Sequence, residues 1–117
     1  MKRIILVTLC LVCFASITFG ASINLKATWT PNTETDMASY RLYRIDTPTR
    51  TLLGTINHPP TLPYTFTLSV ADGSTGTLRF VLTAVDTSGN ESGDSNVMQH
   101  PFDFQPPAPP IGLVVSP

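Results

Sequence analysis

The sequence predicts an all-β fold, an antiparallel sandwich of two sheets. Several segments alternate apolar and polar residues, which is the period of a strand that turns one face to a hydrophobic core. Clusters of Gly, Pro, Asn and Asp separate these segments, and such residues favour tight turns. No stretch after the first twenty residues combines a helical period with capping residues, so we expect essentially no helix there. Short strands joined in this way are typical of two-sheet sandwiches.

The first predicted strand covers residues 23–29. Its apolar face carries Ile23, Leu25, Ala27 and Trp29. An exposed tryptophan could serve as a platform for stacking sugars. Because Trp29 is in phase with apolar neighbours, however, we interpret it as a buried core residue.

Three further strands are predicted between residues 39 and 70. Residues 39–45 place two large side chains on one face, Tyr40 and Leu42. The opposite face of this strand carries Arg41, Tyr43 and Ile45. Residues 51–56 are predicted to form a short edge strand, and residues 64–70 alternate again. The proline-rich residues 58–63 between them cannot donate a regular ladder of hydrogen bonds.

The clearest strand covers residues 77–85. Every second side chain is apolar on the face that we assign to the core: Leu78, Phe80, Leu82 and Ala84. The turn-forming residues 86–90 stop this strand. A more polar strand is then predicted to return through residues 95–98, so that the two strands make a hairpin.

The first twenty residues are typical of a secretory signal peptide. The positive start at Lys2 and Arg3 precedes an apolar run over residues 4–15, and small residues follow. A retained membrane anchor is the alternative, but Ser16 and Thr18 interrupt the run before the roughly 20 apolar residues that a bilayer requires. We therefore expect cleavage near Gly20 and a secreted, extracellular or cell-surface protein.

Composition limits what the exported part can be. The chain has 117 residues, of which 42% are hydrophobic and 13% charged, which suits a single folded domain. Loss of Lys2 and Arg3 changes the formal net charge from −1 to −3, and this balance offers no binding surface for nucleic acid. Both cysteines, Cys10 and Cys13, leave with the signal peptide. The mature chain therefore has no disulfide, no thiol nucleophile and no cysteine-ligated metal site.

The chain resembles a bacterial fibronectin type III domain, an immunoglobulin-like sandwich. The resemblance covers residues 23–98 and is carried by three segments: Leu-Lys-Ala-Thr-Trp-Thr-Pro at 25–31, Tyr-Arg-Leu-Tyr-Arg at 40–44, and Phe-Val-Leu-Thr-Ala-Val-Asp-Thr-Ser-Gly-Asn-Glu-Ser at 80–92. It implies strands B, C, C′, E, F and G. Leu78 stands where the family usually has the tyrosine of its tyrosine corner, and no segment at the start of the mature chain could form strand A.

The tail, residues 101–117, resembles the missing strand. Its proline run should be stiff and extended, and residues 109–115 are similar to the start of a family A strand, with no domain expected after them. Three alternatives remain open: the tail is disordered or the sequence truncated, it folds back on its own sheet, or it is donated to the next molecule. Donation would place Ile111, Leu113 and Val115 beside the strand of Ile23 and Leu25.

Residues that could carry chemistry are few. His58 and His100 both lie beside a proline, and we interpret them as ordinary loop histidines. Four polar residues near one turn do not have the spacing of an EF-hand loop: Asp86, Asn90, Glu91 and Asp94. Asn90 also begins a glycosylation sequon, which matters only in a host that glycosylates. We expect no catalytic residues, no metal and no cofactor.

These observations favour an exported, non-enzymatic structural or adhesive domain over residues 21–100. Its partner would be itself, in a homo-oligomer or filament, or another extracellular protein. The alternative is a monomeric module that binds a surface glycan or protein through exposed side chains such as Tyr43 and Arg41 and through the loop residues 86–94.

Overall fold

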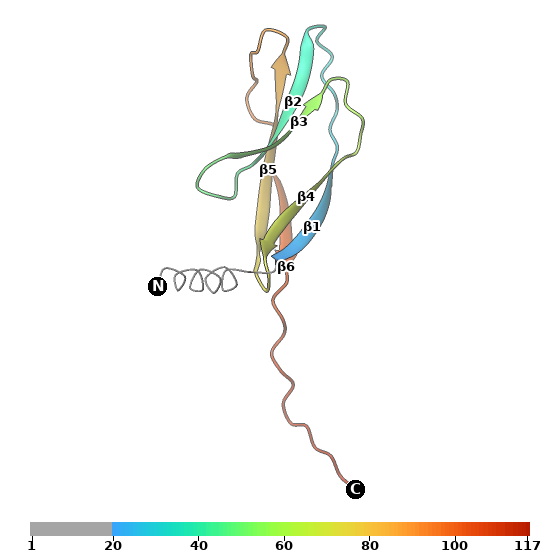
Figure 1. The fold of residues 1–117 in the computed structure, drawn as a ribbon, viewed down its shortest axis with the longest axis vertical. Coiled ribbons are helices and arrows are strands. Elements are labelled where there is room, and N and C mark those ends of the chain that lie inside the picture. Colours follow the sequence, from blue (N-terminus) through green and yellow to red (C-terminus); the bar gives the residue numbers. More distant parts are fainter. Residues whose placement is uncertain (1–19) are drawn as a thin grey trace, which may run out of the picture.

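The computed structural model describes residues 20–117, and these residues form six strands and no helix (Figure 1). The strands are β1 (Gly20–Ala27), β2 (Met37–Arg44), β3 (Thr51–Asn57), β4 (Tyr64–Ala71), β5 (Thr75–Asp86) and β6 (Met98–Asp103). The predicted signal peptide lies outside the described residues, Gly20 excepted. Within residues 20–117 we find no helix that could cross a membrane.

The strands make two antiparallel sheets, which confirms the predicted all-β class. β1 pairs with β4 in the smaller sheet, and the larger sheet has the order β3-β2-β5-β6. The β4–β5 turn lies at one end of the body, and Gly20 of β1 is paired with Ala71 at that same end. β1 and β5 therefore run away from this end, whereas β4 and β6 run towards it.

The strand that returns after β5 lies further along the chain than predicted. β6 begins at Met98 rather than at Ser95. The segment before Met98 contacts β5 through serine residues instead of a regular strand ladder. Ser95 donates its backbone N–H to the Leu82 carbonyl, while its hydroxyl oxygen accepts the Leu82 N–H. Ser92 makes the same pair of bonds with Ala84. Each serine thus meets both backbone groups of one β5 residue, and no regular ladder forms.

One hydrophobic core joins the two sheets. Its buried members come from four strands and from both sheets: Ile23, Tyr40, Leu42, Ile56, Leu78 and Phe80. Phe66 of the smaller sheet packs edge to face on Phe80, with ring centroids 5.5 Å apart. The predicted core faces of residues 39–45 and 77–85 therefore point to this core, and Leu78 is fully buried.

β5 is buried on both faces, which a single predicted core face did not anticipate. Val81, Thr83 and Val85 alternate with the core residues and are also buried. β5 lies inside the larger sheet, between β2 and β6, and polar side chains cover its outer face. This cover comes from residues distant in sequence, so the local pattern does not reveal it.

The Tyr40 hydroxyl connects two loops to the core. It accepts the backbone N–H of Asn32 at 2.8 Å and is hydrogen-bonded with Nδ1 of His58 at 2.9 Å. The Tyr40 ring also meets the edge of Trp29 at a centroid distance of 5.2 Å. One buried side chain therefore fixes the chain after β1 and the chain after β3.

Tyr40→Phe should lower the free energy of unfolding by about 1–2 kcal/mol, because the partly buried Asn32 N–H and the His58 ring each lose a partner. Chemical denaturation measures the change. Tyr64→Phe is the matched control, since its hydroxyl has no hydrogen-bond partner among residues 20–117, and it should change stability by less than about 0.5 kcal/mol. Equal effects of the two variants would contradict the role assigned to Tyr40.

Candidate functional site

The backbone of β1 has a free edge. β1 pairs with β4 along its whole length, from Gly20 opposite Ala71 to Ala27 opposite Tyr64. On its other side no strand of the described residues pairs with it. Unpaired N–H and C=O groups in a row form a template on which another strand can add.

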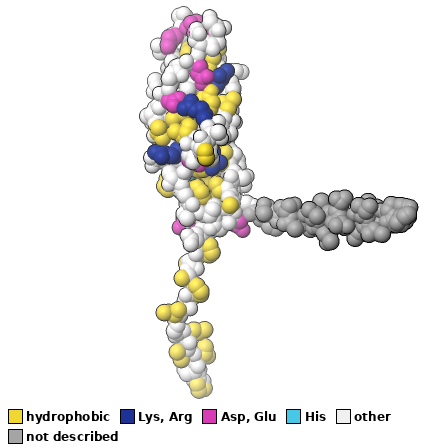
Figure 2. Space-filling view, turned by 90° about the vertical axis from the view of Figure 1, so that its left-hand side faces the viewer, with side chains coloured by type: hydrophobic (Ala, Val, Ile, Leu, Met, Phe, Trp, Pro, Cys, Tyr) yellow, Lys and Arg dark blue, Asp and Glu magenta, His cyan; other side chains and the backbone are white. Residues whose placement is uncertain are grey.

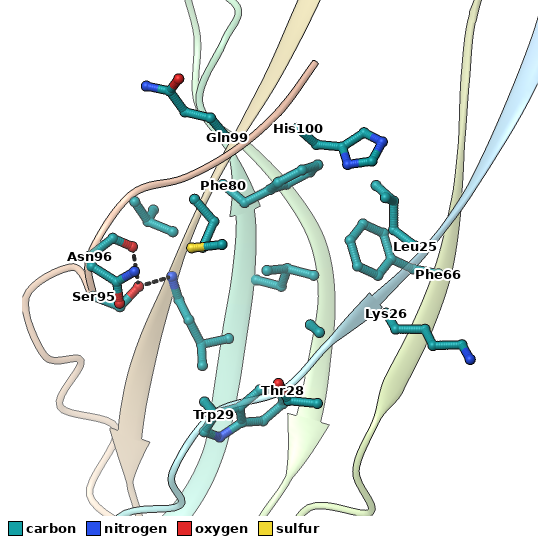
Figure 3. A pocket seen from close by; sticks show the side chains of 15 residues that line it. Leu25, Lys26, Thr28, Trp29, Phe66, Phe80, Ser95, Asn96, Gln99 and His100 are labelled. Atoms are coloured by element: carbon teal, nitrogen blue, oxygen red, sulfur yellow. Dashed lines mark hydrogen bonds between the residues drawn. The ribbon is translucent and has the colours of Figure 1, made fainter. Parts of the chain in front are cut away.

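An apolar groove of about 300 Å³ lies beside this free edge (Figure 3). It runs between β1 and the chain segment 95–100, with the core at its floor. Its apolar lining comes from both sheets: Leu25, Ala27, Trp29, Leu42, Phe66, Phe80, Leu82 and Met98. The gap is therefore a place where the two sheets do not close over their common core.

Trp29 stands at the wall of this groove with an unsatisfied polar atom. Its side chain is only partly buried, so the prediction of a core tryptophan holds for its packing against Tyr40 rather than for full burial. The indole Nε1 is buried and has no hydrogen-bond partner in the described chain. A buried N–H without an acceptor is costly, and native structures usually supply one.

The opposite side of the body is closed. There Tyr64 of β4 packs directly on Gly54 of β3, where an added Cβ would lie 2.5 Å from the tyrosine hydroxyl oxygen. Glycine at this position lets the two sheets approach each other. The groove beside β1 has no such bridge.

The tail leaves the body and touches little of it. β6 ends at Asp103, the Phe104 N–H donates to the Ser74 carbonyl, and the chain then extends away from the two sheets (Figure 1). Hydrophobic side chains line the projecting tail in Figure 2. Four of them are almost wholly exposed, at 83 to 94% of their surface: Ile111, Leu113, Val114 and Val115. Such a run of exposed aliphatic side chains marks an interaction surface or an aggregation hazard.

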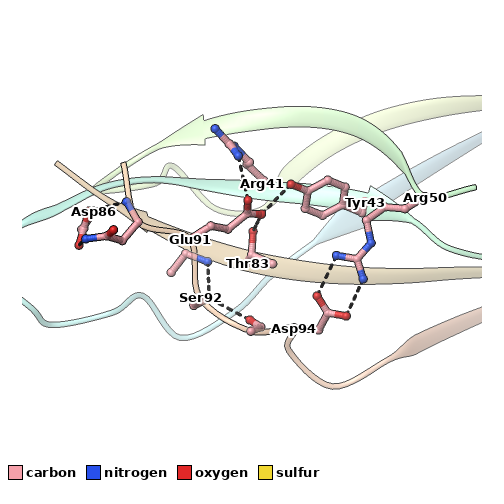
Figure 4. A network of polar contacts seen from close by, with 11 residues as sticks. Arg41, Tyr43, Arg50, Thr83, Asp86, Glu91, Ser92 and Asp94 are labelled. Atoms are coloured by element: carbon pink, nitrogen blue, oxygen red, sulfur yellow. Dashed lines mark hydrogen bonds and ion pairs between the residues drawn. The ribbon is translucent and has the colours of Figure 1, made fainter. Parts of the chain in front are cut away.

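A polar network covers the outer face of β2 and β5 (Figure 4). Its centre is the Glu91 carboxylate, which accepts hydrogen bonds from Thr83 and Tyr43 at 2.6 Å each and from Arg41 at 2.9 Å. Arg50 extends the network, because its guanidinium stacks on the Tyr43 ring at 4.9 Å.

The network also fixes the loop between β5 and β6. Arg50 makes two hydrogen bonds to the Asp94 carboxylate, at 3.0 and 2.7 Å. The Thr83 hydroxyl, the Tyr43 hydroxyl and the Arg41 charge hold the pKa of Glu91 below its usual value, and Arg50 does the same for Asp94. Both loop carboxylates are therefore stabilised in their charged form.

The structure places the two predicted ligand-binding residues inside this network. Arg41 and Tyr43 do lie on the face opposite the core, as predicted, but both are bound to Glu91. A glycan or protein would have to displace those contacts. The sequence does not show this, since Arg41 and Glu91 are 50 positions apart.

The remaining candidate residues have structural partners. His58 is bound to Tyr40, and His100 lies within β6 opposite Leu78 rather than in a loop. Asp86 accepts the N–H groups of Ser88 and Asn90 and so holds the turn after β5. No group of three or more potential metal ligands occurs in residues 20–117.

The self-assembly residues named from the sequence fall in two separate places. Ile23 and Leu25 belong to β1, with Ile23 in the core and Leu25 on the groove. Ile111, Leu113 and Val115 stand on the projecting tail. Sequence reasoning did not find the groove or the part that Met98 takes in it, because a groove between two sheets has no local pattern.

Comparison with known proteins adds no assignment. No protein-family profile, curated protein or solved structure matches this sequence. Functional inference therefore rests on the residues and geometry of this chain.

Glu91→Gln should lower the melting temperature at pH 7 by roughly 5 °C and reduce its dependence on acid pH. The folded pKa of Glu91 lies below its usual 4.5, so its contribution is present above that pH and is lost as the pH falls through the folded pKa. Thermal melts between pH 7 and pH 3 measure both effects.

The matched control for this prediction is Glu34→Gln. Glu34 is exposed and accepts only a long 3.5 Å bond from Asn32. Its melting curve should follow the wild type at every pH. A Glu91 variant that also follows the wild type would show that the network contributes nothing to stability.

Proposed function

We propose that this chain is an exported, non-enzymatic structural subunit of fibronectin type III kind, which assembles head to tail. In this proposal the segment 111–115 of one copy adds as a strand to the free edge of β1 in the next copy. The observation that carries the proposal is the coexistence, in one chain, of an open strand edge beside an apolar groove and an exposed aliphatic segment.

The strand order supports the family assignment. Under the resemblance, β1 and β4 correspond to strands B and E, and the order β3-β2-β5-β6 corresponds to C′, C, F and G. The free side of β1 is the side on which strand A would pair with B. The fully buried Leu78 fills the position where the family usually has a tyrosine.

Strand direction favours donation between molecules over return to the same molecule. The tail leaves at the end of the body where β1 begins. A tail that turned back would therefore run parallel to β1, and residues 104–110 would have to reverse although four of the seven are proline. A tail arriving from a copy beyond the other end of β1 would run antiparallel to it, like every other strand pair here.

The spacer between body and donor segment has a suitable length. Residues 104–110 span about 22 Å if the proline-rich chain is extended at about 3.1 Å per residue. A spacer of this length can connect two bodies stacked end to end without a turn in the chain. Copies joined in this way have the same orientation, so the contact does not close on itself and produces a fibre.

The alternative function, a monomeric module that binds a surface glycan or extracellular protein, has less support. Tyr43 and Arg41 are the side chains proposed for it, and both are held by Glu91. Nothing comparable holds the tail residues.

The chain starting at Ala21 should form fibres or a ladder of oligomers, and the same chain ended after Phe104 should remain monomeric. Truncation removes no residue of a strand or of the core, so the body should melt at nearly the same temperature. Electron microscopy and size-exclusion chromatography measure assembly, and circular dichroism measures the melt.

A full-length control separates loss of the donor from loss of chain length. Leu113→Asp together with Val115→Asp should abolish assembly, because charged side chains cannot enter an apolar groove without a large desolvation cost. If the wild-type chain stays monomeric, or if the truncated chain assembles equally well, the proposal is wrong.

A further inference from the structure

We infer that the groove between β1 and residues 95–100 is a specific receptor for the Leu113 side chain of a second copy, with the donor strand antiparallel to β1. This inference rests on the proposed function and goes beyond it by naming the receptor, the register and the reporting residue. The sequence alone identified only the edge, through Ile23 and Leu25, whereas the groove also includes Trp29 and Met98.

The chemistry of the donor matches that of the groove. The groove is lined mainly by aliphatic and aromatic side chains of both sheets. The donor offers Ile111, Leu113 and Val115 at alternate positions, which share one face when the segment is extended. An added strand with this spacing inserts one row of aliphatic side chains between the sheets and turns Val114 outward.

The size of the β1 residues favours one register. Ala27 is the smallest inward-facing residue of the part of β1 that lines the groove, and it leaves room for a large side chain from the next strand. With Leu113 opposite Ala27, an antiparallel strand places Val115 opposite Leu25 and Val114 opposite Lys26. Ile111 then lies at the level of Trp29.

Trp29 can report on an occupant of this groove, because its side chain forms part of the groove lining. Trp29 is also the only tryptophan of the protein, so its fluorescence reports this one site.

The groove can be blocked without disturbing the separate body. Met98 lines the groove and is 60% exposed, so Met98→Glu places a charge in the receptor at little cost to the fold. Leu52 on β3 is 50% exposed at the other edge of the larger sheet, and Leu52→Glu is its matched control. Met98→Glu should raise the protein concentration needed for assembly at least about tenfold, whereas Leu52→Glu should leave it unchanged.

Trp29 fluorescence is to be measured on the same three proteins: the wild type, Met98→Glu and Leu52→Glu. The emission maximum of the wild-type chain should shift to shorter wavelength as the concentration rises through the assembly range, and Met98→Glu should lose this shift. Assembly without any change in Trp29 emission would overturn the assignment of the groove.

Disulfide trapping tests the register directly, because the chain from Ala21 has no cysteine of its own. Lys26 and Val114 are both exposed, so Lys26→Cys with Val114→Cys leaves the core intact. Under mild oxidation this double variant should give a covalent ladder on a non-reducing gel, since directly opposed residues of paired strands can be bridged. Thr65 lies opposite Lys26 on β4, one strand further away, and Thr65→Cys with Val114→Cys should give at least about tenfold less ladder.

Failure of the inference and failure of the proposed function give different outcomes. A ladder from the Thr65 pair alone would place the donor on β4 and overturn the receptor while keeping head-to-tail assembly. Fibres that depend on the tail, but with no ladder from the Lys26 pair and no effect of Met98→Glu, would do the same. A disulfide within single molecules, or no assembly at all, would overturn both.

Discussion

The two sheets differ in their number of strands, and the rest of this structure depends on that difference. Four strands present one apolar face, and only β1 and β4 cover it. Neighbouring strands are about 4.8 Å apart, so two strands cannot cover four, and a strip of core beside β1 stays open. Two-stranded sheets are marginal alone, which means that side chains such as Phe66 on Phe80 hold the smaller sheet in place. The groove is thus a direct consequence of strand number.

The closed parts of the body are held by partly buried and exposed polar contacts. The described residues contain no cysteine, so no disulfide can reinforce them. The Tyr40 hydroxyl ties two loops to the core, and Glu91 joins the β5–β6 loop to the outer face of β2. These contacts stabilise the monomer on the sides that the open groove does not touch. The assembly that we propose requires such a body, because the subunit must stay folded before it meets its neighbour.

The strand edges differ in how well they are protected. β6 carries Pro101, which cannot donate to a ladder, and β4 is covered near Tyr64, which packs on Gly54. β1 has no proline and only one charged side chain, Lys26. β1 alone combines this unprotected edge with an adjoining apolar groove in the described part of the chain. That combination is why we propose controlled addition of one strand at this place.

The sequence by itself determined the first five strands and the chemical character of the tail. Alternation along residues 77–85 and 64–70 is a local property, and it indicated strands that the structure contains, with Leu78 and Phe80 directed to the core. The aliphatic spacing after the proline run is equally local. Only the tertiary structure decided where β6 begins, because Ser92 and Ser95 satisfy β5 through their side chains. It also decided the burial of Thr83, the hydrogen bond from Tyr43 to Glu91 and the groove at Trp29. Each depends on residues brought together from distant parts of the chain.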